Sequence, residues 1–381
     1  MRHKGYKSRT LIGLNGPVTV RRARFRCSVS GRYYFPLDTV LDLPPWEVTV
    51  SLGKRGMRLA THMGFAELQE ELRYQHDVHL SDTVLNRLLQ QVGGVAEGDR
   101  QAAVEALGVL PEGVAQEEHI LAKEPIARPK RLYISCDGVM YPTRYRQQEG
   151  DRKRIVYQEM KCGTVFWQEG NNTWHKRVLS SRDEPDRFGL CLWELAVRCG
   201  MLQADEVIFI SDGGGWCDTV AREHFRDAIR ILDWYHLSEH IWEAARALYP
   251  DEAAAKVWAS RCHGILRESS GIGLLRYLER SRRSRSVGSR GSKGLDALDA
   301  LIGYVRPRLP ITDYVEYRER GFVIGSGMME STCKQLVGKR LKGCGRQWSE
   351  TGALAMSALI GQRLNRTWEA FWATRPLHRA A

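Results

Sequence analysis

The stretch from residue 131 to residue 233 constrains the fold most, because short apolar runs alternate there with segments of helical periodicity. Three runs with the composition of β-strands come first, and a helix, a strand, a helix and a last strand follow. The expected strands are residues 131–136, 155–166, 174–180, 206–211 and 228–233, and the expected helices are residues 187–199 and 216–225. This βββαβαβ order predicts an α/β domain with a mixed sheet.

That order is the order of a ribonuclease-H-like core. From residue 237 to residue 319 the pattern is almost wholly helical, which predicts an all-α insertion that divides the core into residues 129–236 and 320–366. A basic, Ser- and Gly-rich break at residues 281–294 predicts a mobile loop. The loop either contacts DNA or only connects two helices, and we favour the connector.

The first 128 residues fall into two regions. Residues 1–50 alternate in short β-like pieces with a turn at Ser30-Gly31, which predicts a small hairpin module. Residues 51–128 are expected to be helical, with Ser81 and Asp82 as the N-cap between two helices, and form either a DNA-binding helix-turn-helix or a plain packing unit. Within them, the Ala-, Gly-, Glu- and Pro-rich residues 94–128 predict a linker, after which a new domain starts near Lys130.

Charge and cysteine usage limit the partners and the compartment. Lys and Arg exceed Asp and Glu by 57 to 45, a formal net charge of +12 that favours a polyanionic partner such as DNA. The nine cysteines form no C-x-x-C pair, which fits a reducing compartment. No apolar run is long enough for a membrane helix, so we expect a soluble cytoplasmic protein with no membrane partner.

Two aspartates lie directly after predicted strands. Asp137 follows residues 131–136, and Asp212 follows residues 206–211. Because ligands gather at the carboxyl ends of neighbouring strands in an open α/β sheet, the two aspartates are expected to meet there. Their repulsion calls for a shared proton or a metal ion; the alternative is that each Asp-Gly pair only makes a turn.

A third acid, Glu330, is expected early in a helix that follows a strand at residues 322–324. Its alternative role is to complement the helix dipole in the first turn. Three carboxylates on one core can bind two Mg²⁺ or Mn²⁺ ions, which promote phosphodiester hydrolysis and strand transfer. The sequence therefore predicts Asp137, Asp212 and Glu330 as catalytic residues and metal ligands.

Three sequence blocks resemble those of a known family. Residues 212–216, 231–240 and 324–334, followed by residues 337–341 and Trp348, are similar to the signature blocks of IS-Kra-type insertion-sequence transposases, distant relatives of the Mutator group. The similarity runs in order from about residue 15 to residue 365. It implies a DDE-type transposase that cuts and rejoins DNA at insertion-sequence ends, with Asp137, Asp212 and Glu330 as the triad.

The resemblance also implies an accessory motif and an assembly. Asp233 and His236 match the C/D-x-x-H motif of Mutator-like transposases; the Asp either orients the His, organises the active site or nearby DNA with it, or makes a packed Asp-His hydrogen bond without direct chemistry. Because two transposon ends must be joined, the reaction implies a homodimer or higher assembly on DNA, associated with the nucleoid when bound.

One departure concerns zinc. Relatives commonly carry a C-x-x-C in the early hairpin, whereas this chain has Cys27-Ser-Val-Ser30. Losing one thiolate of a four-ligand site weakens zinc binding, so we expect a degenerate zinc-ribbon-like hairpin without zinc.

Basic residues gather after Glu330. Beside the acids they are expected to bind DNA phosphates, although a solvated basic face is the alternative. The predicted DNA-binding residues are Lys334, Lys339, Arg340, Lys342, Arg346 and Trp348.

Two competing functions remain. A dinucleotide-binding loop at residues 322–327 is disfavoured because Glu330 stands where that fingerprint needs its third glycine. An inactive or domesticated transposase relative that binds DNA without cutting is the main alternative, and metal-dependent cleavage separates the two.

Overall fold

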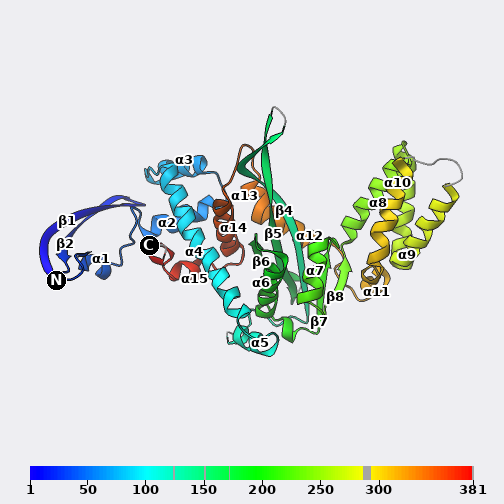
Figure 1. Cartoon of the computed structure of the whole chain (residues 1–381), viewed down its shortest axis with the longest axis horizontal. Coiled ribbons are helices and arrows are strands. Elements are labelled where there is room, and N and C mark those ends of the chain that lie inside the picture. The colour runs from blue at the N-terminus through cyan, green and yellow to red at the C-terminus, as the bar shows by residue number, and fades with distance from the viewer. Residues whose placement is uncertain (123–124, 150–151, 171, 286–292, 380–381) are drawn as a thin grey trace.

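The computed structural model describes residues 1–122, 125–149, 152–170, 172–285 and 293–379. It shows an α/β protein with a five-stranded mixed sheet near its middle, a small β-sheet at one end and a helical unit at the other (Figure 1). The predicted α/β class and the mixed sheet are confirmed.

The central sheet contains β4 (Arg131–Glu149), β5 (Arg152–Glu169), β6 (Thr173–Ser181), β7 (Glu206–Ser211) and β8 (Ile229–Leu232). Their order across the sheet is β6-β5-β4-β7-β8, with antiparallel pairing from β6 to β4 and parallel pairing from β4 to β8. The crossover helices are α6 (Pro185–Arg198) and α7 (Gly215–His224), so the predicted βββαβαβ succession is confirmed.

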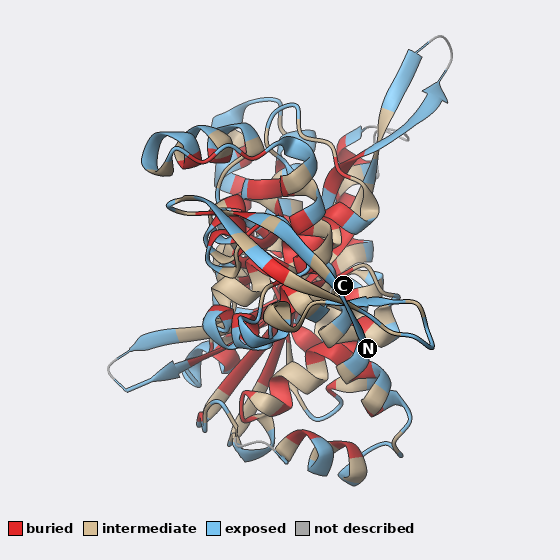
Figure 2. Ribbon diagram, turned by 90° about the vertical axis from the view of Figure 1, so that its left-hand side faces the viewer, coloured by how far each residue is buried: buried red, intermediate tan, exposed pale blue. Residues whose placement is uncertain are grey.

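Both faces of the sheet are covered. Leu132 and Ile134 of β4 pack with α6 and α7, whereas Tyr133 between them packs with the helical unit on the other face. This explains why the strand is apolar without interruption, since a strand covered on both sides buries successive side chains. Figure 2 shows the buried residues gathered along the sheet and its neighbouring helices.

The first strand is longer than predicted. Residues 131–136 were expected to end before Asp137, but β4 continues to Glu149 because β5 pairs with it along its whole length. Asp137 therefore lies inside β4, opposite Cys162 of β5. The parallel pairing with β7, however, ends at Ser135, so Asp137 still lies beyond the end of that neighbour.

The N-terminal segment forms a three-stranded antiparallel sheet of β1 (Arg2–Gly13), β2 (Gly16–Arg26) and β3 (Tyr33–Tyr34), followed by the short α1 (Pro36–Val40). The main hairpin turns between Gly13 and Gly16, whereas the turn predicted from the sequence lies at Ser30-Gly31. In the second turn, the Ser30 N–H donates to the Cys27 sulfur at 3.4 Å. The expected lack of zinc there stays a prediction.

The next region is helical, as predicted, with α2 (Val50–Ala60), α3 (Phe65–His76), α4 (Asp82–Gly108) and α5 (Val114–Leu121). Ser81 caps α4 by accepting a bond from the Val84 N–H. The linker predicted at residues 94–128 is wrong for most of its length, since α4 and α5 occupy it. Its Ala and Glu residues are good helix formers, and Val104 and Leu107 are buried.

The helical unit contains α8 (Trp234–Leu248), α9 (Glu252–Arg285), α10 (Lys293–Val305), a 3-10 turn (Arg306–Ile311) and α11 (Tyr314–Glu319). It lies beyond the parallel edge of the sheet (Figure 1). Helix α9 bends at Ser269 and Ser270, whose backbone angles are not helical. The predicted loop at residues 281–294 is helical at both ends, and its centre, 286–292, lies outside the described residues.

The chain then returns to the sheet. Residues 322–324, predicted as a strand, form no strand in the structure, and the Ile324 carbonyl accepts a hydrogen bond from the Trp234 N–H at the start of α8. The remaining helices are α12 (Gly327–Cys333), a π-helical turn (Lys334–Gly338), α13 (Lys339–Leu341), α14 (Glu350–Leu364), α15 (Trp368–Ala373) and α16 (Pro376–Arg379).

Helix α14 packs closely on α4. A Cβ atom on Gly93 of α4 would lie 2.6 Å from that of Ala355, so glycine permits the approach of the two helices. One buried cluster joins the N-terminal helices to α12–α14 and to Tyr141 and Met160 of the sheet. Among the described residues, no helix combines the length and apolar character that crossing a membrane requires.

Candidate catalytic site

A cavity of about 300 Å³ opens where β4, β7, α8 and α12 approach one another. Its lining brings together the three predicted acids and both residues of the predicted accessory motif. The titratable residues that line it, cysteines aside, are Asp137, Asp212, Asp233, Tyr235, His236, Glu239 and Glu330.

Asp137 is half-buried within β4. Its Oδ1 accepts a bond from the Gly138 N–H at 2.7 Å, and the Cys333 sulfur lies 3.7 Å from its Oδ2. Burial raises the pKa of the Asp137 carboxyl, and the charge of Asp212 raises it further, against the Gly138 bond and His236. The charged form is therefore disfavoured, and a cation between the two aspartates would relieve that cost.

Asp212 begins the loop between β7 and α7. Its Oδ1 accepts a bond from the Gly214 N–H at 2.7 Å, and its carbonyl accepts one from the Tyr304 hydroxyl at 2.6 Å. The next residue, Gly213, has a φ of +70°, and its carbonyl accepts a bond from Arg308 at 2.6 Å. The helical unit thus holds the loop that carries Asp212.

Glu330 lies in the first turn of α12 and is exposed toward the cavity. The apolar side chains of this helix and of the turns after it are buried: Met329, Cys333, Leu336, Val337 and Leu341. The helix therefore packs on the sheet through one side and presents its acid on another.

Asp233 is 5% exposed and caps α8 by accepting a bond from the Tyr235 N–H at 3.0 Å. It also accepts bonds from the Ser326 N–H, at 3.0 Å, and from the Ser326 hydroxyl. Ser326 directly precedes α12, so Asp233 fixes the loop from which the Glu330 helix starts.

His236 lies one turn into α8 and is partly exposed. It contacts Glu239, with 3.7 Å between Nδ1 and the carboxylate, and its ring meets that of His240 edge-on at 4.9 Å. No hydrogen bond joins it to Asp233 among the residues described. The packed Asp-His hydrogen bond considered from the sequence is therefore not seen among the described residues, and the role of the motif stays a prediction.

The three acids are spread across the cavity. Among the described residues, a set of three ligand atoms within 4.8 Å of one another occurs only at Asp186, Glu223 and His224, where both acids are exposed. In a two-metal site the ions lie about 3.5–4 Å apart and share their ligands, so three carboxylates need not meet at one point. Carboxylate oxygens are the donors that Mg²⁺ and Mn²⁺ prefer.

Asp218 is another acid that follows β7 along the chain, in the first turn of α7. The structure pairs it with Arg230 and, at 2.8 Å, with Arg222, and it does not line the cavity. Its charge is therefore paired outside the cavity that Asp137 and Asp212 line.

The predicted DNA-binding cluster divides by exposure. Arg340 is 4% exposed and donates from Nε to the Ala60 carbonyl at 2.7 Å, and burial lowers its pKa to about 10. Trp348 is 9% exposed and donates to the Leu341 carbonyl at 3.1 Å. Both face the interior, which corrects the prediction that they bind DNA.

The remaining four residues are more accessible. Arg346 is half-buried and donates to the carbonyls of Lys339 and Arg340, whereas Lys334, Lys339 and Lys342 are exposed. For these lysines, DNA binding stays a prediction.

Sequence reasoning missed two groups at the site. Glu239 lines the cavity, and its spacing of three residues from His236 on a helix is a signal that could have found it. Tyr304 and Arg308 hold the Asp212 loop, but their partners lie 92 and 95 residues away along the chain, and no local pattern announces them.

Comparison with protein-family models gives no match to this chain, and comparison with curated proteins gives none either.

Proposed function

We propose that this chain is a DDE-type transposase of the IS-Kra group that cuts and rejoins DNA with two divalent metal ions. The observation that carries the proposal is the cavity shared by Asp137, Asp212 and Glu330, which come from three segments far apart in the sequence. The resemblance of the sequence blocks implies the same three residues as the triad.

The strand order supports a ribonuclease-H-like core. In the order β6-β5-β4-β7-β8, three antiparallel strands precede two parallel ones, and the two aspartates lie on the adjacent strands β4 and β7 or just after them. A helical unit between β8 and α12 then corresponds to an insertion before the third acid.

The donor set fits Mg²⁺ or Mn²⁺. Asp137 and Asp212 line one cavity, the charge of Asp212 helps to raise the pKa of Asp137, and Glu330 adds a third oxygen donor from α12. When bound, two such ions supply an activated water or 3′-hydroxyl and stabilise the departing oxygen.

The protein's own part is to hold these donors. Tyr304 and Arg308 restrain the loop of Asp212, and Asp233 restrains the start of the Glu330 helix through Ser326. Preorganised ligands of this kind avoid reorganisation during the reaction. We assign Asp233 to positioning rather than to chemistry.

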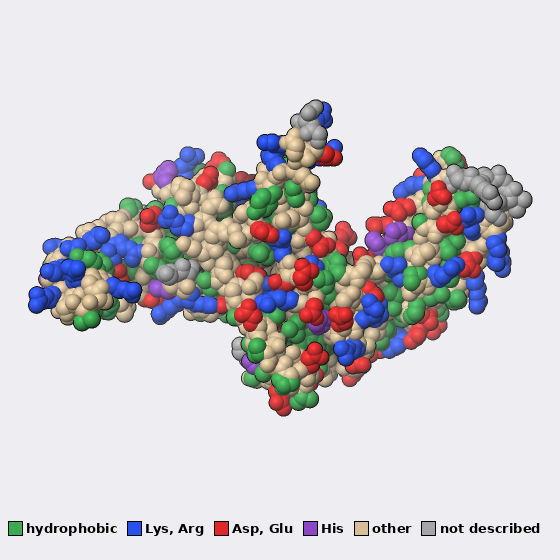
Figure 3. Space-filling model, in the orientation of Figure 1, with side chains coloured by type: hydrophobic (Ala, Val, Ile, Leu, Met, Phe, Trp, Pro, Cys, Tyr) green, Lys and Arg blue, Asp and Glu red, His purple; other side chains and the backbone are tan. Residues whose placement is uncertain are grey.

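Basic surfaces support a DNA partner. Lys and Arg side chains gather on the N-terminal sheet in Figure 3. The exposed basic residues of its two long strands are Arg2, Lys4, Lys7, Arg21 and Arg26. By neutralising DNA phosphates, these side chains would contribute affinity that does not depend on the DNA sequence. Because the reaction joins two DNA ends, it also implies a dimer or larger assembly.

The test is Mg²⁺- or Mn²⁺-dependent cleavage of DNA that carries the element's own ends. Asp137→Asn, Asp212→Asn and Glu330→Gln should each abolish cleavage while DNA binding is kept. Asp218→Asn is the matched control, because Asp218 follows the same strand but lies outside the cavity, and it should cut.

Cleavage that persists in a triad variant would remove that acid from the site. No cleavage by the wild type on authentic ends, with DNA binding present, would favour the alternative of an inactive relative that only binds DNA.

A further inference from the structure

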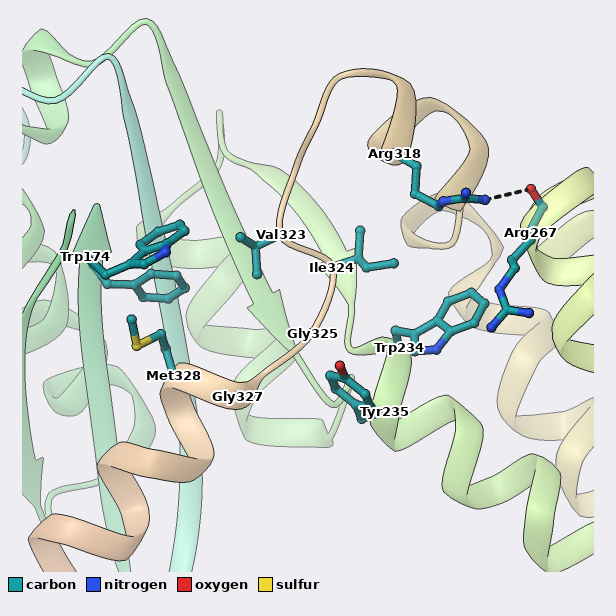
Figure 4. Close-up of a pocket in the computed structure, with 11 residues that line it drawn as sticks. Trp174, Trp234, Tyr235, Arg267, Arg318, Val323, Ile324, Gly325, Gly327 and Met328 are labelled. Atoms are coloured by element: carbon teal, nitrogen blue, oxygen red, sulfur yellow. Dashed lines mark hydrogen bonds between the residues drawn. The ribbon is translucent and has the colours of Figure 1, made fainter. Parts of the chain in front are cut away.

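A second cavity, of about 530 Å³, adjoins the catalytic one. Tyr235 lines both, and the second cavity lies along the loop that runs from Val323 to Gly327 (Figure 4). The catalytic assignment uses none of its side chains.

Aromatic rings form its walls. On one side Trp174 of β6, 38% exposed, contacts Phe166 with 5.8 Å between ring centroids. On the other side Trp234 and Tyr235 project from the start of α8 (Figure 4). Tyr235 is 63% exposed, and its ring lies against Gly325, where a Cβ atom would come within 2.4 Å of it.

The cavity also carries unneutralised positive charge. Arg267 of α9 and Arg318 of α11 line it, and the Arg318 guanidinium donates to the Arg267 carbonyl at 3.3 Å. The Arg267 guanidinium lies 5.7 Å from the Trp234 ring. Neither arginine makes an ion pair within the part of the chain that the structure describes.

The aromatic wall continues beyond this cavity. A third cavity, of about 690 Å³, shares Trp174 and Val323 with the second and adds Trp167. Trp167 itself is 3% exposed, so a single strand that leaves the catalytic cavity would meet two exposed rings in succession, those of Tyr235 and Trp174.

We infer that the cavity between Trp174 and Tyr235 binds an unstacked base of single-stranded DNA next to the cleaved phosphate, with Arg267 and Arg318 near its backbone. Every base offers a face for stacking on an aromatic ring, and guanidinium groups pair with phosphate. The inference rests on the proposed function, which supplies the DNA and the cut end.

The probe is a fluorescent single-stranded oligonucleotide of about eight nucleotides, within the usual range of single-strand sites, with one 5-iodouracil base. Its affinity is measured by anisotropy in EDTA, so that no cleavage is needed. Trp174→Ala and Arg267→Ala should weaken binding by on the order of tenfold, as loss of a stacked base or a phosphate contact does. Trp174→Phe should keep most of the affinity.

Matched controls exist for both variants. Tyr74→Ala removes an aromatic ring that is 89% exposed on α3, and Arg276→Ala removes an exposed arginine further along α9. Both should bind the oligonucleotide as the wild type does. Photo-crosslinking of the wild type, mapped by mass spectrometry, should place the iodouracil on Trp174, Trp234 or Tyr235.

Three results would each overturn the inference. They are wild-type affinity in both Trp174→Ala and Arg267→Ala, crosslinks confined to other parts of the chain, and tighter binding of a free mononucleotide than of the oligonucleotide. Should Trp174→Ala fail to fold, Arg267→Ala and the wild-type crosslinks decide. Because these assays contain no metal, the inference can hold in a protein that does not cut, and can fail in one that does.

Discussion

Replacement of Asp233 by alanine should uncouple the Glu330 helix from the sheet. The carboxylate accepts bonds from the Tyr235 N–H and the Ser326 N–H, both at 3.0 Å, and from the Ser326 hydroxyl. Loss of an N-cap costs about 1 kcal/mol, and a hydrogen bond to a charged group contributes about 1.5–3 kcal/mol. Because Tyr235 is exposed and its N–H can bond to water, we expect a total loss of about 2–4 kcal/mol in the free energy of unfolding.

Urea unfolding followed by circular dichroism measures this loss, with the DNA cleavage assay run beside it. Asp313→Ala is the matched control, because Asp313 caps α11 and accepts a bond from the Ser270 hydroxyl at 2.7 Å, but lies outside the cavity of the acids. It should cost about 1 kcal/mol and leave cleavage intact.

Under conditions where both variants are folded, Asp233→Ala should cut far more slowly than Asp313→Ala. Equal cleavage by the two, or an unfolding free energy no lower in Asp233→Ala than in Asp313→Ala, would refute the positioning role.

Three further predictions concern stability. Arg340→Ala should lower the free energy of unfolding by about 2–3 kcal/mol, because the bond to Ala60 and the ring contact with Trp348 are lost, whereas exposed Lys339→Ala should change it by about 0.5 kcal/mol or less in urea unfolding. Gly93→Ala should lower the free energy of unfolding by about 1–3 kcal/mol, because the added Cβ separates α4 from α14. Gly94→Ala, whose Cβ meets open space, should raise it by up to about 1 kcal/mol, and a rise in both variants would refute the close contact. Burial alone would raise the pKa of Asp183, but the Ser181 hydroxyl and Arg100 lower it below its usual 3.8. The Asp183 carboxylate therefore stabilises the folded protein at neutral pH, and this stabilisation is lost as pH falls below 3.8 through the lower folded-state pKa. Thermal unfolding should therefore show Asp183→Asn destabilised at pH 7 and a difference that shrinks in strong acid; a difference independent of pH would contradict this.

The sequence predicted the parts of the fold that depend on local pattern. Apolar runs marked each strand of the central sheet, and helical periodicity marked the crossover helices α6 and α7. These signals are local because strand and helix periods lie within a few residues.

Features set by distant partners were not predictable. The length of β4 depends on its pairing with β5, and the linker prediction failed because α4 continues along a surface that α14 provides. In the sequence Arg340 is one of several basic residues and was predicted to lie on the surface. In the structure its side chain is buried and donates to the Ala60 carbonyl. Asp137, Asp212 and Glu330 were predicted from the sequence to act together, and the fold adds the cavity that all three line.

The most direct test of the central claim is the position of Mn²⁺ in crystals of the protein, located by anomalous scattering. We predict manganese in the cavity of Asp137, Asp212 and Glu330, and its loss from crystals of Asp212→Asn. Manganese bound only at Asp186, Glu223 and His224, or bound unchanged in Asp212→Asn, would contradict the assignment of these three acids as the metal site.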